Sequence, residues 1–322
     1  MTARPVVWVT RRLPADVEEA LAARFDVRSR GDDAPMGAAE LQAAFAEADG
    51  VLCTVTDRVD AACFAVPGRR ARIVANFGVG VNHIDLAAAT AAGVTVTNTP
   101  GVLTDDTADL AILLMLSVLR RASSGERELR AGQWTGWRPT HHLGQSVRGK
   151  TLGIVGFGRI GRAVTERAMA GLGMQVLAWT RGRSATALPT GVTRVETLEE
   201  LLRAADVVSL HCPATPETRR LMGAAQFAQM RSTAVLVNTA RGDVVDEAAL
   251  VAALEAGRIA GAGLDVYERE PAVHPGLLGR DDVVLLPHLG SATVETRTAM
   301  GLRALENLDA FFAGRVPPDR VG

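Results

Sequence analysis

A glycine-rich turn between an apolar run and an amphipathic pattern constrains the fold of this 322-residue chain most strongly. Gly156, Gly158 and Gly161 stand at GxGxxG spacing directly after the apolar run. The first permits a tight turn, the second lets the backbone approach a pyrophosphate, and the third lets a helix pack close to the strand. The helix would open at Arg159 and Ile160, with its N-terminus toward the phosphates. The segment predicts a dinucleotide site; the alternative is an ordinary strand–helix turn.

The end of the next predicted strand, 175–179, carries no acidic residue. NAD enzymes usually have Asp or Glu there to bind the ribose 2′-hydroxyl. Here Thr180, Arg181, Arg183 and Ser184 follow, and guanidinium groups bind a 2′-phosphate that a carboxylate would repel. We therefore expect NADP(H) to be the preferred cofactor, with NAD(H) possible. The alternative is that these arginines are solvated loop residues of an arginine-rich chain.

Composition narrows the function classes. The net charge of −1 offers no basic field for nucleic acid, and no run of 18 apolar residues suggests a membrane span. The N-terminus lacks the apolar region of a signal peptide. Cys53, Cys63 and Cys212 have no metal or disulfide spacing, so we expect a cytoplasmic protein. His141 and His142 are interpreted as loop residues, and no His/Cys/Asp cluster in the sequence suggests a metal.

Strands alternate with helical patterns along the chain, which predicts an α/β protein with parallel sheets. We expect two doubly wound domains, one inserted into the other. Residues 1–101 and 290–322 would form a flavodoxin-like substrate-binding domain, and residues 102–289 a Rossmann dinucleotide-binding domain with six strands in the order 3-2-1-4-5-6. The strands are expected near residues 6–10, 26–29, 50–54, 72–76 and 95–98 of the first domain, and near 152–155, 175–179, 207–211, 234–238, 261–265 and 283–286 of the second.

Two long helical patterns connect these domains. An apolar helix over 104–121 is expected to lead into the second domain, and a helix over 294–312 is long enough to return to the first. Pro317 and Pro318 mark a loose tail. Shorter helices are expected over residues 15–24, 38–47 and 86–92.

Three polar side chains follow three of the predicted strands, at the sheet edge where ligands bind in open α/β sheets. Arg241 can bind a carboxylate and polarise a carbonyl. His288 can donate a proton to the carbonyl oxygen as a hydride reaches the carbon. Glu270, if paired with His288, would orient the imidazole and favour its charged form. Together they suit the reduction of a 2-oxo acid. Asp265 is a weaker candidate, for contact with the nicotinamide amide.

With these motifs the chain resembles the D-isomer-specific 2-hydroxyacid dehydrogenases over nearly its whole length. The family's Arg, Glu and His are matched by Arg241, Glu270 and His288. The resemblance implies that backbone N–H groups of Val79 and Gly80, in NFGVGVNHID (76–85), bind the substrate carboxylate. Further cofactor contacts are implied in VTNTPGVLTDDTADLAILLML (96–116), HCPATPETR (211–219), VNTARGDVVDE (237–247) and LLPHLGSATVETR (285–297), at Thr107, Cys212, Pro213, Thr218, Thr239, Ala240 and Gly290.

Within this family the chain is most similar to glyoxylate/hydroxypyruvate reductases. TRGR (180–183) resembles their NADP-selective loop, and GQWTGWRP (132–139) resembles a segment whose Trp reaches the neighbouring subunit's active site. Trp137 fits that role, so we expect a homodimer in which it contacts substrate. The alternative is interface packing without substrate contact. The apolar helix over 104–121 is expected to take part in the dimer.

The sequence thus predicts NADPH-preferring reduction of glyoxylate or hydroxypyruvate, with His288 as the proton donor. Two alternatives stay open. One is an NAD(P)-sensing corepressor-type protein of the same fold, which would retain the three polar residues. The other is a dehydrogenase for another 2-hydroxy acid, such as gluconate or phosphoglycerate. The expected partner is a small 2-oxo or 2-hydroxy acid, not nucleic acid or a membrane.

Overall fold

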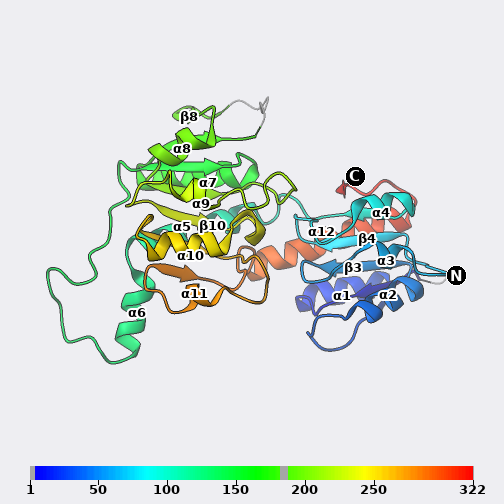
Figure 1. Ribbon diagram of the computed structural model, residues 1–322. Coiled ribbons are helices and arrows are strands. Elements are labelled where there is room, and N and C mark those ends of the chain that lie inside the picture. The colour runs from blue at the N-terminus through cyan, green and yellow to red at the C-terminus, as the bar shows by residue number, and fades with distance from the viewer. Residues whose placement is uncertain (1–3, 182–187, 322) are drawn as a thin grey trace. The chain divides into compact units, whose positions relative to one another are not determined.

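The computed structural model describes residues 4–181 and 188–321 of the chain (Figure 1). The chain divides into two compact units, Met1–Leu103 with Ala292–Gly322, and Thr104–Ser291. These boundaries lie within two residues of the expected ones. The α/β class with a largely parallel sheet in each unit is confirmed. The substrate-binding and dinucleotide-binding roles of the two units stay predictions.

The first unit contains the strands β1 (Val6–Val9), β2 (Asp26–Arg28), β3 (Gly50–Thr54), β4 (Ile73–Phe77), β5 (Thr95–Thr97) and β13 (Arg320–Val321), and the helices α1 (Ala15–Arg24), α2 (Ala38–Glu47), α3 (Ala61–Phe64), α4 (Leu86–Ala91) and α12 (Val294–Phe312). Strands β1 to β5 are parallel and lie in the flavodoxin-like order 2-1-3-4-5. Helices α1 and α12 cover one face of the sheet, and α2, α3 and α4 cover the other. Both faces of the central strands are therefore buried, which is why β3 and β4 consist mostly of apolar residues.

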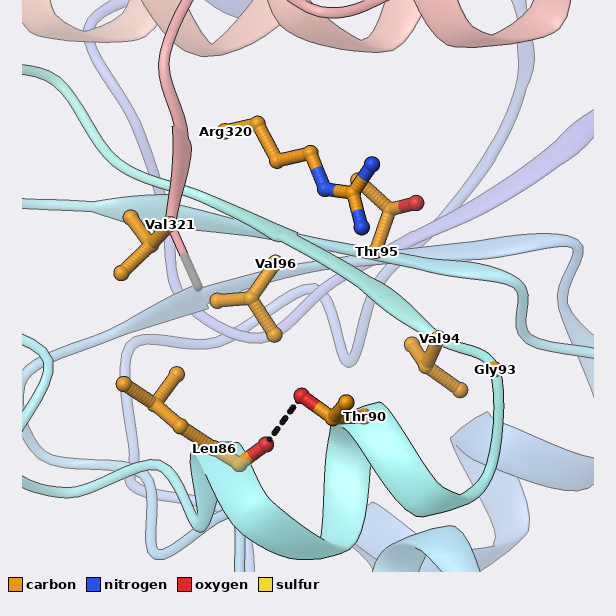
Figure 2. A pocket seen from close by; sticks show the side chains of 8 residues that line it. All are labelled: Leu86, Thr90, Gly93, Val94, Thr95, Val96, Arg320 and Val321. Carbon is orange, nitrogen blue, oxygen red and sulfur yellow. Dashed lines mark hydrogen bonds between the residues drawn. The ribbon is translucent and has the colours of Figure 1, made fainter.

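The C-terminal segment is not the loose tail that the two prolines predict. Arg320 and Val321 form β13, which pairs antiparallel with β5 and lies above α4 beside a small pocket (Figure 2). Asp319, just before this strand, is buried and accepts two hydrogen bonds from Arg303 of α12, at 2.5 and 2.9 Å. Buried Asn307 donates to the same carboxylate at 3.0 Å and accepts from the Asp319 N–H at 3.0 Å. These side chains hold the tail to the sheet.

The second unit contains the strands β6 (Thr151–Val155), β7 (Gln175–Trp179), β8 (Val192–Arg194), β9 (Val207–Leu210), β10 (Val235–Asn238), β11 (Gly261–Leu264) and β12 (Val283–Leu285), and the helices α5 (Thr104–Leu119), α6 (Ala122–Arg130), α7 (Arg159–Leu172), α8 (Leu198–Ala204), α9 (Ala224–Phe227), α10 (Glu247–Glu255) and α11 (Pro275–Leu278). A 3₁₀ turn over Gly242–Val244 follows β10. Helices α5 and α7 cover one face of the sheet, and α8, α9 and α10 cover the other.

The strand order of this unit corrects one part of the sequence prediction. Among the described residues the sheet has seven strands, in the order β12-β11-β10-β9-β6-β7-β8. The third strand of the Rossmann order is the short β8 beside β7, whereas β9, which the sequence places third, lies beside β6. With β8 counted, the order 3-2-1-4-5-6 holds and β12 adds a seventh strand. Because Val192 is the only apolar residue of β8, no hydrophobic run marks it in the sequence.

The predicted helix over 104–121 ends at Leu119, and a second helix, α6, follows it. Arg121, between them, has a φ of +52°. The nine residues of α6 are mostly polar, so the sequence shows no apolar stripe for it. Helix α5 is largely buried within its own unit and packs against β11, where Gly263 leaves room for Leu114. Its apolar surface therefore does not by itself require a second subunit, and the homodimer stays a prediction.

None of the helices that the structure describes combines the length and the apolar character that a bilayer crossing requires.

The polar contacts of Asp319 predict a measurable contribution to stability. Asp319→Ala would leave the side chains of Arg303 and Asn307 without their shared acceptor, at a cost of about 2 kcal/mol or more. Urea unfolding followed by circular dichroism should give a lower midpoint for this variant. Arg315→Ala, at an exposed position of the same tail, is the control and should leave the midpoint unchanged. Equal midpoints for both variants would show that the tail is not held by Asp319.

Candidate active site

The turn between β6 and α7 is shaped by its three glycines. Gly156 has a φ of +94°, and a Cβ there would lie 2.6 Å from the backbone nitrogen of Cys212. A Cβ on Gly161 would lie 2.4 Å from the Gly156 carbonyl oxygen, so α7 packs tightly on the turn. The Cβ position of Gly158, in contrast, has no described atom within 4 Å. Among the described residues no side chain caps α7, which begins at Arg159. Open space beside uncapped N–H groups fits a pyrophosphate.

Two buried polar atoms at the neighbouring strand ends lack a hydrogen-bond partner within the described residues. They are Oγ1 of Thr239, directly after β10, and Nδ1 of His211, directly after β9. The other ring nitrogen of His211 lies 2.8 Å from Ser209 Oγ. Burial lowers the pKa of His211 to about 3, so its ring is neutral near pH 7. Unpaired buried groups are uncommon in folded proteins, and a bound polar ligand at this edge would satisfy them.

Thr180 and Arg181 follow β7 as the sequence predicts, whereas Arg183 and Ser184 lie outside the described residues. Nη2 of Arg181 lies 3.3 Å from Oε2 of Glu217, and both side chains are more than half exposed. Such exposed pairs contribute roughly 0–1 kcal/mol, so Arg181 can exchange Glu217 for a phosphate at little cost.

One basic residue near this loop was missed by the sequence analysis. Arg194 of β8 brings Nη1 to 3.5 Å from the Thr180 hydroxyl oxygen. It places a second guanidinium beside the position where an NAD enzyme carries its acid. The signal was lost because β8 itself was not predicted.

The loop after β9, which carries three expected cofactor contacts, is closed by Thr218. Its hydroxyl donates to the Pro213 carbonyl at 2.7 Å and accepts from the Thr215 N–H at 2.8 Å. Cys212 is buried at the start of this loop, and burial raises the pKa of its thiol to about 11. The thiol is therefore protonated near pH 7, and the backbone of Cys212 is the part that adjoins Gly156.

His288 and Glu270 form a hydrogen-bonded pair in the second unit. Nδ1 of His288 lies 2.8 Å from Oε2 of Glu270, and each side chain is 30% exposed. Oε1 of Glu270 accepts from the Tyr267 N–H at 3.0 Å, which fixes the carboxylate. Because Glu270 holds Nδ1, Nε2 is the nitrogen that can face a substrate. His288 has a φ of +56°, a conformation in which few residues other than Gly and Asn are common.

Arg241 follows β10 and is positioned by its own loop. Its carbonyl accepts from Asn238 Nδ2 at 2.9 Å, and its Nη1 donates to the Ala240 carbonyl at 2.7 Å. The next residue, Gly242, lies so close to Tyr267 that a Cβ would be 1.8 Å from the Tyr267 carbonyl carbon. The Arg241 loop and the Glu270 loop are therefore in direct backbone contact.

Asp265, at the end of β11, contacts the backbone of the His288 loop. Its two carboxylate oxygens accept from the N–H groups of Leu289 at 2.6 Å and Gly290 at 2.8 Å. Its own carbonyl accepts from the His288 N–H at 2.9 Å. The Thr107 hydroxyl, from α5, donates to the Gly290 carbonyl at 3.0 Å. Asp265 and Thr107 thus hold the loop that carries His288, and their predicted contacts with cofactor stay predictions.

The ionisation of the three acidic and basic groups follows from these contacts. Burial raises the pKa of Glu270, but the hydrogen bond and charge of His288, with smaller effects of Tyr267 and Arg241, outweigh it and hold the pKa below its ordinary value. Burial raises the pKa of Asp265 above its ordinary value, against its backbone hydrogen bonds. Burial lowers the pKa of Arg241, opposed by the charge of Glu270. Near pH 7 Glu270 is therefore a carboxylate beside His288.

The loop predicted to bind the substrate carboxylate lies in the first unit, after β4. The Val79 carbonyl accepts from Asn98 Nδ2 at 2.8 Å, and the Gly80 carbonyl accepts from Asn76 Nδ2 at 3.0 Å. Oδ1 of Asn76 lies 3.1 Å from His83 Nε2. The Gly78 carbonyl also accepts from Asn76 Nδ2, at 2.9 Å. The bonds to the Gly78 and Val79 carbonyls fix the peptide planes that contain the Val79 and Gly80 N–H groups, the expected carboxylate donors.

Trp137 lies in the loop after α6 and is 82% exposed, and Trp134 is 51% exposed. Their predicted contact with a second subunit stays a prediction. The same loop brings His141 and His142 onto Glu128, a cluster that the sequence analysis did not find.

Comparisons with known proteins agree over the whole chain. The model of the D-isomer specific 2-hydroxyacid dehydrogenase NAD binding domain matches residues 112–290. A glyoxylate reductase of Thermococcus litoralis is 41% identical over 322 residues, which cover 99% of this chain and 97% of that protein. A glyoxylate reductase of Aeropyrum pernix is 44% identical over 324 residues, which cover 99% and 96%. The solved structure of an NADPH-dependent glyoxylate/hydroxypyruvate reductase of Sinorhizobium meliloti, in complex with NADP and malonate, has a TM-score of 0.87 and 37% identity, covering 99% of this chain and 97% of that one.

Because α7 packs tightly on the glycine turn, a side chain at position 161 should weaken dinucleotide binding. Gly161→Ala would place its Cβ 2.4 Å from the Gly156 carbonyl oxygen, so the first turn of α7 must move. We expect the affinity for NADPH, measured by fluorescence titration, to fall by about 10-fold or more, since 1.4 kcal/mol of lost contacts is enough. The control is Gly171→Ala on the same helix, where a Cβ meets no described atom within 4 Å. Equal affinities of the two variants for NADPH would contradict a pyrophosphate site at the glycine turn.

Proposed function

Because the chain belongs to the D-isomer specific 2-hydroxyacid dehydrogenase family, we propose that it reduces glyoxylate or hydroxypyruvate to the 2-hydroxy acid, with NADPH as the preferred cofactor and His288 as the proton donor. Family membership makes it an NAD(P)-dependent enzyme acting on 2-oxo or 2-hydroxy acids. The observation that carries the finer proposal is the 2.8 Å pair of His288 and Glu270, on the same sheet edge as Arg241.

Arg241 supplies the positive charge that a 2-oxo acid requires. A guanidinium binds a carboxylate through two parallel hydrogen bonds and draws electron density from an adjacent carbonyl. The Arg241 carbonyl accepts from Asn238 and its guanidinium donates to the Ala240 carbonyl, so both the backbone and the side chain are held before substrate arrives. Substrate binding then requires little further ordering of this residue, which keeps the entropic cost low.

His288 holds the proton that the substrate oxygen takes up. Glu270 accepts at Nδ1, so the imidazolium carries its transferable proton on Nε2. After the proton leaves, the neutral ring keeps its Nδ1–H bond to Glu270 and so keeps its orientation. When bound, a nicotinamide cofactor supplies the hydride. Gly156, Gly158 and Gly161 with the start of α7 would hold its pyrophosphate, and Thr239 would contribute its unpaired hydroxyl.

Replacing His288 tests the proposal directly. We choose His288→Asn because Asn tolerates the φ of +56° and its amide is no proton donor of suitable acidity. The kcat for glyoxylate with NADPH should fall by roughly 10²–10⁴-fold, with the affinity for NADPH unchanged. The control is His274→Asn at the N-cap of α11, a position where Asn is also favoured.

The wild-type assay separates the proposed enzyme from its alternatives. Turnover of glyoxylate or hydroxypyruvate at about 1–10³ per second supports the reductase. Tight NADPH binding without turnover of any 2-oxo acid in a panel that includes 2-keto-gluconate would favour a nucleotide-sensing protein. A near-normal kcat of His288→Asn at every pH would mean that another group donates the proton.

The charges at the end of β7 favour NADPH over NADH. No acid follows β7, whereas Arg181 and Arg183 follow it in sequence and Arg194 adjoins Thr180. Each charge-assisted hydrogen bond to a 2′-phosphate contributes about 1.5–3 kcal/mol. An unphosphorylated ribose gains nothing from these groups, so the difference favours NADPH.

A cofactor switch checks this argument. The double variant Arg181→Ala with Arg183→Ala should weaken NADPH by on the order of 10²-fold and leave NADH little changed. Adding Thr180→Asp should supply a ribose acceptor, repel the phosphate and move the preference toward NADH. The measurement is kcat/KM with each cofactor. Arg219→Ala, at an exposed position of the loop after β9, is the control. A wild type that prefers NADH would overturn the proposed preference.

A further inference from the structure

A cluster of three potential metal ligands lies in the second unit, far in sequence from Arg241, Glu270 and His288. Glu128 is on α6, and His141 and His142 are in the loop that follows it. Oε2 of Glu128 lies 2.8 Å from Nε2 of His141 and 2.5 Å from Nε2 of His142. We refer to these residues as the Glu128 cluster.

The three donor atoms lie close together. They lie within 4.8 Å of one another, and the two imidazole rings are 4.3 Å apart between centroids. The side chains are only 18% exposed for Glu128, 21% for His141 and 29% for His142. His142 takes a φ of +48°, so the backbone turns sharply where both rings face the same carboxylate. The cluster is half-buried and still open to solvent on one side.

The donor set matches a transition metal and not a hard cation. Two imidazole nitrogens and one carboxylate oxygen are ligands that Zn²⁺ takes at about 2.0–2.2 Å, whereas Mg²⁺ and Ca²⁺ prefer oxygen. A tetrahedral ion with such bonds separates its ligand atoms by roughly 3.3 Å. The observed oxygen–nitrogen distances of 2.5 and 2.8 Å are shorter. The carboxylate therefore needs to move outward by less than 1 Å.

The neighbouring arginines of α6 have other partners. Arg127 lies 2.5 Å from Asp281, and Arg130 pairs with Glu126. The carboxylate of Glu128 is instead hydrogen-bonded by the two histidines, and the bond from His142, followed by that from His141, lowers the pKa of its carboxyl below the ordinary value. Without a metal the cluster is a hydrogen-bonded contact in which both rings donate to one oxygen. Zn²⁺ would take the place of the two bridging Nε2 protons, each of which moves to Nδ1 of its ring or is released to solvent.

We propose that Glu128, His141 and His142 form a Zn²⁺ site, with water in the fourth position. The site links the middle of the loop over 131–150 to α6. Elsewhere this loop is held by Gln145, which donates from its N–H to the Leu119 carbonyl at 2.8 Å and from its side chain to the Thr233 carbonyl at 3.0 Å. A bound ion would add a second attachment of this loop, through His141 and His142 to α6. These two residues come shortly after the segment of the exposed Trp134 and Trp137.

Titration of the full-length, tag-free protein with Zn²⁺ tests the site. After treatment with chelator, isothermal titration calorimetry should give one Zn²⁺ per chain, and saturating Zn²⁺ should raise Tm, since a ligand that binds the folded state stabilises it. Co²⁺ in place of Zn²⁺ should give the visible absorption bands of a tetrahedral nitrogen–oxygen site. None of these readouts depends on turnover, so failure of the proposed reductase function would leave this test intact.

Variants of the cluster decide between metal and hydrogen bonding. Loss of an outer-shell partner already weakens metal binding 10–100-fold, so His141→Ala, His142→Ala and Glu128→Gln should each weaken Zn²⁺ by about 100-fold or more. Glu126→Gln on the same helix and His274→Asn are the controls and should bind as wild type does. Circular dichroism without metal verifies that each variant is folded. Wild-type binding no tighter than that of the folded variants would overturn the proposal, as would a stoichiometry unchanged in all three.

Discussion

The carboxylate of Asp265 is the contact on which the arrangement of His288 beside Glu270 depends. The carboxylate accepts from the N–H groups of Leu289 and Gly290, and the Asp265 main-chain carbonyl accepts from the His288 N–H, so the residue that follows β11 binds three consecutive amides of one loop. This places the imidazole beside Glu270, on the loop that follows the same strand. A buried carboxylate is costly unless hydrogen-bonded, and here the backbone of the His288 loop meets that requirement. The same hydrogen bonds therefore position the His288 loop and compensate the Asp265 carboxylate for its lost contact with water.

The regular elements that carry the site follow closely from the sequence, because buried parallel strands and amphipathic helices leave strong patterns. The start of α7 and the bounds of α12 agree with the prediction. Three of the elements that were missed have no such pattern. Strand β8 has three residues and β13 has two, and α6 is a polar helix. Their positions depend on partners distant in the chain, such as β5 for β13.

The candidate site shows the same division. The spacing of Arg241, Glu270 and His288 after their strands was enough to predict one shared edge, and the His288–Glu270 pair was expected from chemistry. The role of Asp265 in holding the His288 loop was not expected from the sequence. A carboxylate at a strand end is typical of a ligand contact, and its backbone partners become known only in the structure. The Glu128 cluster has no local pattern in the sequence, because one member lies on a polar helix and the other two in the irregular loop that follows it. Its geometry exists only in the folded loop.

The contact of Gly242 with Tyr267 has a consequence for how such a protein can diversify. Because backbone meets backbone there, any side chain at position 242 would force the Arg241 loop and the Glu270 loop apart, so the observed interval between Arg241 and Glu270 requires glycine. The spacing of these two side chains is thus set by contact between main-chain atoms. Related sequences that accept bulkier acids would therefore need their substitutions away from the Gly242–Tyr267 contact. Substrate selectivity can then change while the spacing of Arg241 and Glu270 is kept.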